Sequence, residues 1–182
     1  MFIEDGSGSG HRVAISEGNK LRTYGVMESE EWHMNEDLGL TYSLVVSQTP
    51  AGANDCFCYI KNTSDYDLII TTMKAYVPTD ETIQIKFNDA GTPAGGTTGV
   101  PVNRNAGSGN TIDATVVVGN DITGLSGGAV VDQLFFNGTD TAHKFSWGSG
   151  LIVPRNKTMS FYAVTGSILV NATLSMHYHG KI

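Results

Sequence analysis

The sequence predicts an all-β protein, a β-sandwich or jelly-roll-like domain with an extended N-terminal arm. Two features of composition favour it: charged residues make up only 16% of the 182 residues, and 22 residues are glycine. About ten short segments with strand patterns also recur at intervals near 8–12 residues, which is typical of sandwiches, jelly rolls and barrels. No strand–helix–strand alternation occurs, so a doubly wound α/β fold is not expected.

The chain divides into a flexible N-terminal arm, residues 1–10, and a single β-sandwich domain, residues 11–182, a length that fits one domain. The glycines and serines of residues 6–10 cannot bury enough apolar surface to order themselves. The apolar residues of the arm lie at its tip, where a groove on a partner could hold them. The arm residues that we expect to contact a partner are Met1, Phe2, Ile3 and Asp5.

In the first half of the body, strands are predicted where apolar and polar residues alternate, as they do from Leu40 to Val46. The acidic stretch 29–37 is the only plausible helical turn, and it could equally form a loop. The stretch 62–65, rich in turn-forming residues, predicts a hairpin-type connection between the strands on either side of it. The predicted extended segments are Arg12–Ser16, Lys20–Glu28, Leu40–Ser47, Cys56–Lys61, Leu68–Val77 and Thr82–Phe87.

The second half begins with a long glycine-rich segment, Asp89–Asn110, which predicts a functional or disordered loop. A second turn-rich segment is predicted at Gly119–Gly128. The clearest hairpin pairs Lys157–Val164 with Ile168–His179 around the turn at residues 165–167. The other predicted strands are Ala114–Val118, Val130–Phe136, His143–Trp147 and Leu151–Val153.

Two cysteines and two histidines are candidate metal ligands. Cys56 and Cys58 are two residues apart in one predicted strand, so alternation places both on the same face, with poor geometry for a mutual disulfide. His177 and His179 share a face of the last strand, and pairing of the two strands would create a tetrahedral zinc site. That spacing is unusual for zinc, so we predict two buried hydrophobic thiols, exposed histidines and no metal or cofactor.

Several function classes are disfavoured by the sequence. The net charge of −7 argues against nucleic-acid binding, and no apolar run is long enough to span a membrane. No serine elbow, phosphate-binding glycine loop or convincing carboxylate pair is present, so we predict a non-enzymatic protein without catalytic residues. No signal peptide is recognised, and the glycosylation triplets at Asn62, Asn137, Asn156 and Asn171 therefore carry no weight.

Aromatic residues concentrate in the C-terminal half, and most of them are expected in the core. Phe135 and Phe136 are consecutive, so in a strand they face opposite sides and one of them reaches a second surface. Trp147 is the residue we select as a candidate partner contact, because an exposed indole face can stack on a sugar ring.

The beginning and the end of the chain carry a family resemblance. The residues concerned are Ile3, Asp5, Gly6, Gly8, Gly10, Val13, Ala14, Asn19, Lys20, Leu21 and Val26. This opening resembles that of tailed-bacteriophage virion structural proteins, in which a glycine-rich arm precedes a β-rich body. The ending, with the Val153-Pro154 step, Gly166 and a long final strand, resembles viral β-sandwich modules.

The resemblance implies a structural protein of the virion, assembled in the host cytoplasm, that decorates or cements the capsid shell. Its implied partners are the major capsid protein or neighbouring virion subunits. We expect a homo-oligomer, with a trimer favoured, and neither nucleic-acid nor membrane binding. The alternative is a tail, neck or fibre module that binds a receptor glycan, with Trp147 as the stacking residue.

Overall fold

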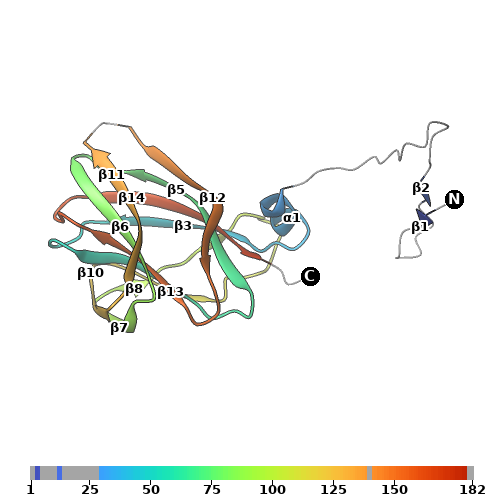
Figure 1. Cartoon of the computed structure of the whole chain (residues 1–182), viewed down its shortest axis with the longest axis horizontal. Coiled ribbons are helices and arrows are strands. Elements are labelled where there is room, and N and C mark those ends of the chain that lie inside the picture. Colours follow the sequence, from blue (N-terminus) through green and yellow to red (C-terminus); the bar gives the residue numbers. More distant parts are fainter. Residues whose placement is uncertain (1–2, 5–11, 14–28, 139–140, 180–182) are drawn as a thin grey trace.

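The structure, a computed structural model, describes residues 3–4, 12–13, 29–138 and 141–179. It confirms the predicted all-β fold: two antiparallel sheets face each other, and one short helix, α1 (Glu30–Glu36), lies at one end of the body (Figure 1). Arg12–Val13 (β2) of the first predicted strand pairs antiparallel with Ile3–Glu4 (β1). The predicted strand Lys20–Glu28 lies outside the described residues.

One sheet has five strands in the order β12-β5-β14-β3-β9. The other has seven, in the order β11-β6-β13-β4-β10-β7, with β8 paired to β10. The strands are β3 (Thr41–Gln48), β4 (Asp55–Asn62), β5 (Asp67–Tyr76), β6 (Asp80–Phe87), β7 (Ala90–Ala94), β8 (Thr97–Thr98), β9 (Val102–Asn103), β10 (Ala114–Ser126), β11 (Ala129–Asn137), β12 (His143–Val153), β13 (Thr158–Ala163) and β14 (Val170–His179).

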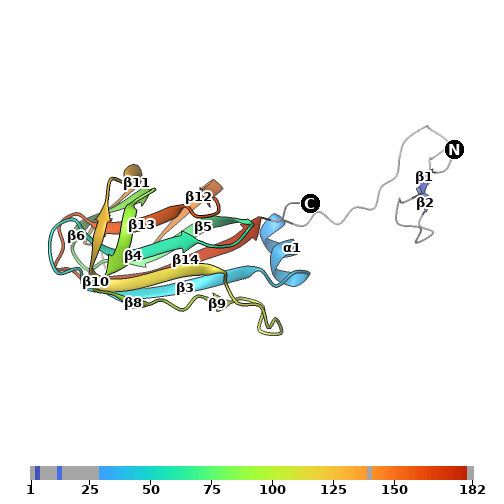
Figure 2. The same cartoon turned by 90° about the horizontal axis from the view of Figure 1, so that it is seen from below.

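Eight of these strands form a jelly roll. The four-stranded order β3-β14-β5-β12 faces the order β4-β13-β6-β11, and successive strands alternate between the sheets except where β6 is followed by its neighbour β11. This double Greek-key order defines the jelly-roll architecture. Strands β7–β10 are inserted between β6 and β11 and extend both sheets on the side of β3 and β4 (Figure 2).

The core lies between the two sheets because each strand directs alternate side chains inward. Ile83 and Ile85 of β6 and Leu174 of β14 are fully buried there, as the alternation predicts. The largest fully buried side chains are Tyr42, Phe57, Phe161, Leu44, Ile60, Leu68, Ile70, Met73, Ile83, Ile85, Met159 and Leu174.

Both predicted hairpins are wrong, because the strands concerned belong to different sheets. β13 pairs with β4 and β6, whereas β14 pairs with β3 and β5. In the same way, β4 and β5 are consecutive in the chain but do not pair. The segments 62–65 and 165–167 therefore connect opposite sheets instead of closing hairpins.

Asn62 explains why the chain crosses between sheets after β4. Its side chain is fully buried, and its amide nitrogen donates to the carbonyls of Tyr66 and Val153 at 2.7 and 2.8 Å. Its side-chain oxygen accepts from the backbone of Ser64 at 3.0 Å. These bonds are possible only if the chain folds over the edge of the core, and they also fix the connection from β12 to β13.

Glu81 stabilises the crossing from β13 to β14 by similar buried hydrogen bonds. Its buried carboxylate accepts from the backbone nitrogens of Thr82 and Thr165, both at 2.8 Å, and of Gly166 at 3.0 Å. Gly166 has φ +76°, and a Cβ there would lie 1.9 Å from the carbonyl oxygen of Gly52. The turn thus needs a glycine and a buried anion from a distant strand.

The segment Asp89–Asn110, predicted as a long functional or disordered loop, contains the short strands β7, β8 and β9. Its base is fixed by the buried Asp89, whose carboxylate accepts from Ser160 Oγ, from Tyr162 OH at 2.9 Å and from the backbone of Gly128 at 2.9 Å. Asp89 precedes the inserted strands β7–β10 and Gly128 follows them, so these bonds connect both ends of the insertion to β13.

Two further boundaries differ from the prediction. β10 continues through Gly119–Gly128, predicted to be turn-rich, as far as Ser126, and β12 runs unbroken through the gap predicted between Trp147 and Leu151. Each strand contains an irregularity in its pairing, between Val118 and Ile122 in β10 and between Ser146 and Leu151 in β12. Such bulges explain why glycines within these strands mimic turns.

The faces of β14 give a first test. Leu174→Ala removes buried apolar surface and leaves a cavity, so we expect a loss of about 2–5 kcal/mol in the free energy of unfolding. Thr173→Ala, on the half-buried opposite face, should cost within about 0.5 kcal/mol. Urea unfolding of both variants measures the difference, and a larger loss for Thr173→Ala would contradict the assigned facing.

The carboxylate of Glu81 gives a second test. Glu81→Gln sets an NH₂ group against one of three backbone N–H donors, so we expect a loss of about 1–3 kcal/mol. Asp80→Asn, at the exposed neighbouring position, is the matched control and should change stability by about 0.5 kcal/mol or less. Equal effects in denaturant melts would show that the Glu81 contacts do not stabilise the crossing.

Candidate binding surfaces

Trp147, the aromatic residue selected from the sequence, lies half-buried on β12, an edge strand of the five-stranded sheet. Its ring packs against the main core, and its Nε1 donates to Asp132 Oδ2 at 2.6 Å. The bond joins β12 to β11, the edge strands of the two sheets. Of the arm residues predicted to bind a partner, Met1, Phe2 and Asp5 lie outside the described residues, and Ile3 pairs with Val13.

Beside Trp147, strand β11 presents apolar side chains to solvent. Phe136 points inward, with its ring centroid 5.5 Å from that of Phe145 on β12, whereas Phe135 points outward and is 69% exposed. The predicted opposite facing of these two phenylalanines is thus confirmed. Val130 and Val131 on the same strand are also exposed. We call Val130, Val131 and Phe135 the β11 patch.

A second apolar set lies at the opposite end of the sheet order, on the five-stranded sheet. Val45 of β3 is 72% exposed, and Val102 of β9 is exposed where it pairs with Ser43. Val100 precedes β9 and is exposed as well. We call Val45, Val100 and Val102 the β3–β9 patch. Val45 also borders a shallow groove of about 230 Å³ on the outer face of β3, β14 and β5.

The third surface is formed by α1, which is a helix where the sequence allows either a helical turn or a loop. Ser29 caps the helix by accepting from the backbone nitrogen of Trp32 at 3.2 Å, and Glu30 and Glu31 occupy the first turn, where acidic residues suit the helix dipole. Met34 is the only buried helix residue. The rest of α1 is therefore held on the body chiefly by polar contacts.

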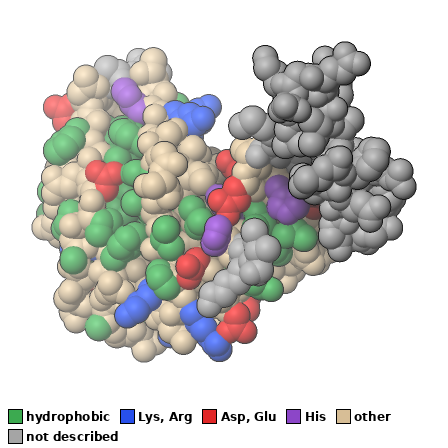
Figure 3. Space-filling view, turned by 45° about the vertical axis from the view of Figure 1, so that its right-hand side comes forward, with side chains coloured by type: hydrophobic (Ala, Val, Ile, Leu, Met, Phe, Trp, Pro, Cys, Tyr) green, Lys and Arg blue, Asp and Glu red, His purple; other side chains and the backbone are tan. Residues whose placement is uncertain are grey.

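Those contacts link α1 to three parts of the body. Arg104, which follows β9, pairs with Glu31 at 2.5 Å, and the imidazole of His179 on β14 contacts the carboxylate of Glu30. The backbone nitrogen of Leu40 donates to the carbonyl of Met34 at 2.7 Å. Figure 3 brings this end of the molecule forward and shows histidine and acidic side chains gathered together.

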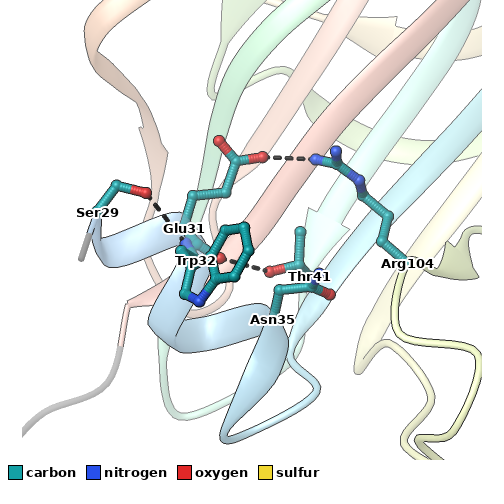
Figure 4. Close-up of a pocket in the computed structure, with 6 residues that line it drawn as sticks. All are labelled: Ser29, Glu31, Trp32, Asn35, Thr41 and Arg104. Atoms are coloured by element: carbon teal, nitrogen blue, oxygen red, sulfur yellow. Dashed lines mark hydrogen bonds and ion pairs between the residues drawn. The ribbon is translucent and has the colours of Figure 1, made fainter.

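A pocket of about 270 Å³ lies between α1, the start of β3 and Arg104 (Figure 4). Trp32, a residue that is 59% exposed, borders the pocket, and the Nε1 of its ring donates to Glu36. The Oδ1 of Asn35 is buried and meets no hydrogen-bond donor among the described residues. The lining residues are Ser29, Glu31, Trp32, Asn35, Thr41 and Arg104.

His177, predicted to be exposed, is in fact 3% exposed, and neither ring nitrogen has a hydrogen-bond partner among the described residues. Burial lowers its pKa, an effect that the nearby carboxylates of Glu30 and Glu31 oppose and that His179 reinforces. The cause of the burial is α1, which packs on β14 and which sequence periodicity alone could not place there.

The cysteines and histidines do not converge on one site. Cys58 lies in the main core, whereas Cys56 lies in a separate cluster with Tyr59, Ile122 and Tyr162. The predicted shared face is wrong because the pairing of β4 with β13 shifts between these residues. Both thiols are free and buried, as predicted, and burial raises the pKa of Cys56 to about 12. They are accordingly protonated and unreactive at neutral pH.

Two features are absent from the described part of the chain. It contains no group of three or more His, Cys, Asp or Glu side chains arranged to hold a metal ion. It also contains no helix of the length and apolar character needed to cross a membrane. Comparison with protein-family models, with curated proteins and with solved structures gave no match.

The sequence did not identify Trp32 as a site residue, because Glu30, Glu31, Glu36 and Asp37 give its segment the appearance of a solvated acidic loop. One signal was present: a large aromatic residue in the most acidic stretch of the chain is poorly placed to enter a core. Of the residues that complete the pocket, Arg104 is more than seventy positions from Trp32, and no local pattern connects either Arg104 or Thr41 with the tryptophan.

Burial of His177 predicts a pH dependence of stability. Its pKa is lowered in the folded protein, so the unfolded chain binds more protons as the pH falls below about 6.5, and the fold is progressively destabilised there. His177→Leu should therefore lose less stability than the wild type between pH 7.5 and pH 5. Urea melts at the two pH values measure this.

The control is Thr173→Ala, which removes a half-buried side chain without a titratable group from the same strand. It should retain the pH dependence of the wild type. A wild-type slope in His177→Leu would contradict the assignment of the acid sensitivity to His177.

Proposed function

We propose that this chain is a non-enzymatic structural protein of a tailed-bacteriophage virion, which decorates or cements the capsid shell. The observation that carries the proposal is the pair of unlike apolar patches on a jelly-roll body, the β11 patch and the β3–β9 patch. Exposed apolar side chains that gather on an edge or face of a sheet favour contact with another protein. Jelly rolls serve as capsid domains, although the same fold also occurs in lectins.

The placement of the patches favours a symmetric homo-oligomer. They belong to opposite ends of the strand order and to different sheets, so the β11 patch of one copy can meet the β3–β9 patch of the next. Such a head-to-tail contact between different surfaces closes into a ring when the rotation between copies fits. A trimer is the ring we favour, seated on the major capsid protein or on neighbouring virion subunits.

The acidic character of the chain suits this role. A net charge of −7 keeps the free protein soluble and favours a shell surface with basic patches. It also disfavours contact with the phosphate backbone of a packaged genome. We therefore place the protein on the virion, without a nucleic-acid or membrane partner.

Phe135→Ser tests the contact between copies. The substitution removes the most exposed aromatic ring of the β11 patch, and we expect the oligomer to dissociate at protein concentrations at least tenfold higher than for the wild type. Gln133→Ser, on the same exposed face two residues away, is the matched control. Sedimentation velocity measures both, and a monomeric wild type would contradict the ring.

Attachment to the shell is tested separately. The purified chain is mixed with intact mature or expanded capsid shells of the source virus and pelleted with them. We expect saturable co-sedimentation, weakened as salt screens the charged surfaces. Failure of the wild-type chain to pellet with intact shells would overturn the decorating role.

A further inference from the structure

We propose that the pocket beside α1 binds a neutral saccharide, with one sugar ring stacked on Trp32. This site is independent of the patches and of Trp147, and it adds a ligand-binding activity to the proposed structural role. Three features carry it: an exposed indole held by Glu36, a buried acceptor without a donor, and the Glu31–Arg104 ion pair at the rim.

The indole of Trp32 is exposed but not free to turn. Its backbone nitrogen is fixed by Ser29 at 3.2 Å, and its ring nitrogen donates to Glu36 one helical turn later. The ring lies among the residues that line the pocket (Figure 4), and apolar surface of Trp32 is open to solvent. A sugar ring offers a complementary face of C–H groups, and stacking removes apolar surface from water on both sides.

Asn35 supplies the clearest polar feature. Its Oδ1 is buried without a donor, a state that is unusual because buried polar atoms are nearly always hydrogen-bonded. The backbone carbonyl of the same residue accepts from Asn105 at 2.9 Å, which holds this part of α1 in place. Because this atom is also closed to solvent, a ligand hydroxyl can donate to it only when the side chain of Asn35 turns toward the pocket.

The charged rim indicates a neutral ligand. Glu31 and Arg104 pair at 2.5 Å across one side of the pocket, so their charges cancel locally while carboxylate lone pairs and guanidinium N–H groups stay available. Neighbouring hydroxyls of a sugar can donate to the carboxylate of Glu31 and accept from the guanidinium of Arg104. A phosphate or a sialic acid would have to compete with Glu31 for the guanidinium.

The size of the pocket limits the part of the ligand that enters. About 270 Å³ lies just below the range of roughly 300–1,000 Å³ that holds drug-sized ligands. We therefore assign the pocket to one ring of an oligosaccharide, with the other residues of the glycan extending into solvent.

The test begins with an array of neutral and sialylated oligosaccharides probed with the whole chain. Neutral glycans that bind are then titrated while the fluorescence of Trp32 is recorded in the Trp147→Phe background, in which Trp32 is the only tryptophan. We expect the signal to saturate with one site per chain. Binding of sialylated glycans alone would overturn the assignment.

Two variants locate the site, with binding followed by calorimetry. Trp32→Ala should abolish binding, and Asn35→Leu should weaken it at least tenfold. Because Trp32 is exposed, its variant should melt like the wild type, which separates lost binding from lost folding. The matched control, Gln133→Ser, should bind normally.

The outcomes distinguish this proposal from the structural role. Glycan binding that survives Trp32→Ala, or a wild type that binds no saccharide on the array, would overturn the pocket assignment. Neither result would affect the structural role proposed from the two patches. Conversely, Phe135→Ser should disrupt the oligomer and leave the affinity for the glycan unchanged.

Discussion

The fold depends on buried hydrogen bonds at the places where the chain crosses from one sheet to the other. A jelly roll places most consecutive strands in opposite layers, so every crossing must bend backbone over the edge of an apolar core and still satisfy its polar groups. Asn62 does this for two crossings at once, through the carbonyls of Tyr66 and Val153, and Glu81 does it for the crossing at Gly166. Without these bonds, the buried polar groups at each crossing would be unsatisfied. Pairing of consecutive strands as a hairpin would then no longer be disfavoured.

This constraint explains which parts of the fold could be predicted from the sequence. The alternation from Leu40 to Val46 and the faces of β14 are local patterns of period two, and they predict strands and buried sides correctly. Partner strands are not encoded locally. Residues 165–167 look like a hairpin turn until Glu81, more than eighty positions earlier, is brought beside them.

The two tryptophans show the same limit for function. Trp147 stands in an aromatic strand and Trp32 in an acidic turn, which made the first the obvious surface candidate. Asp132 accepts the ring N–H of Trp147 and holds it against the core, whereas Trp32 stays exposed beside Asn35 and Thr41. Asp132 could not be linked to Trp147 from sequence spacing, because their hydrogen bond joins the edge strands of two different sheets. Thr41 and Trp32 line one pocket only because α1 packs beside the start of β3.

The burial of Asn62 has a practical consequence for producing the protein. Asn62-Thr63-Ser64 is an acceptor triplet for N-linked glycans, yet its side chain is fully enclosed and makes three hydrogen bonds. In a eukaryotic secretory host, an oligosaccharyltransferase that reached this asparagine before the chain folded would attach a group that the closed sandwich has no room for. During secretion, glycan transfer to Asn62 would therefore compete with folding. Expression in the bacterial cytosol avoids this competition.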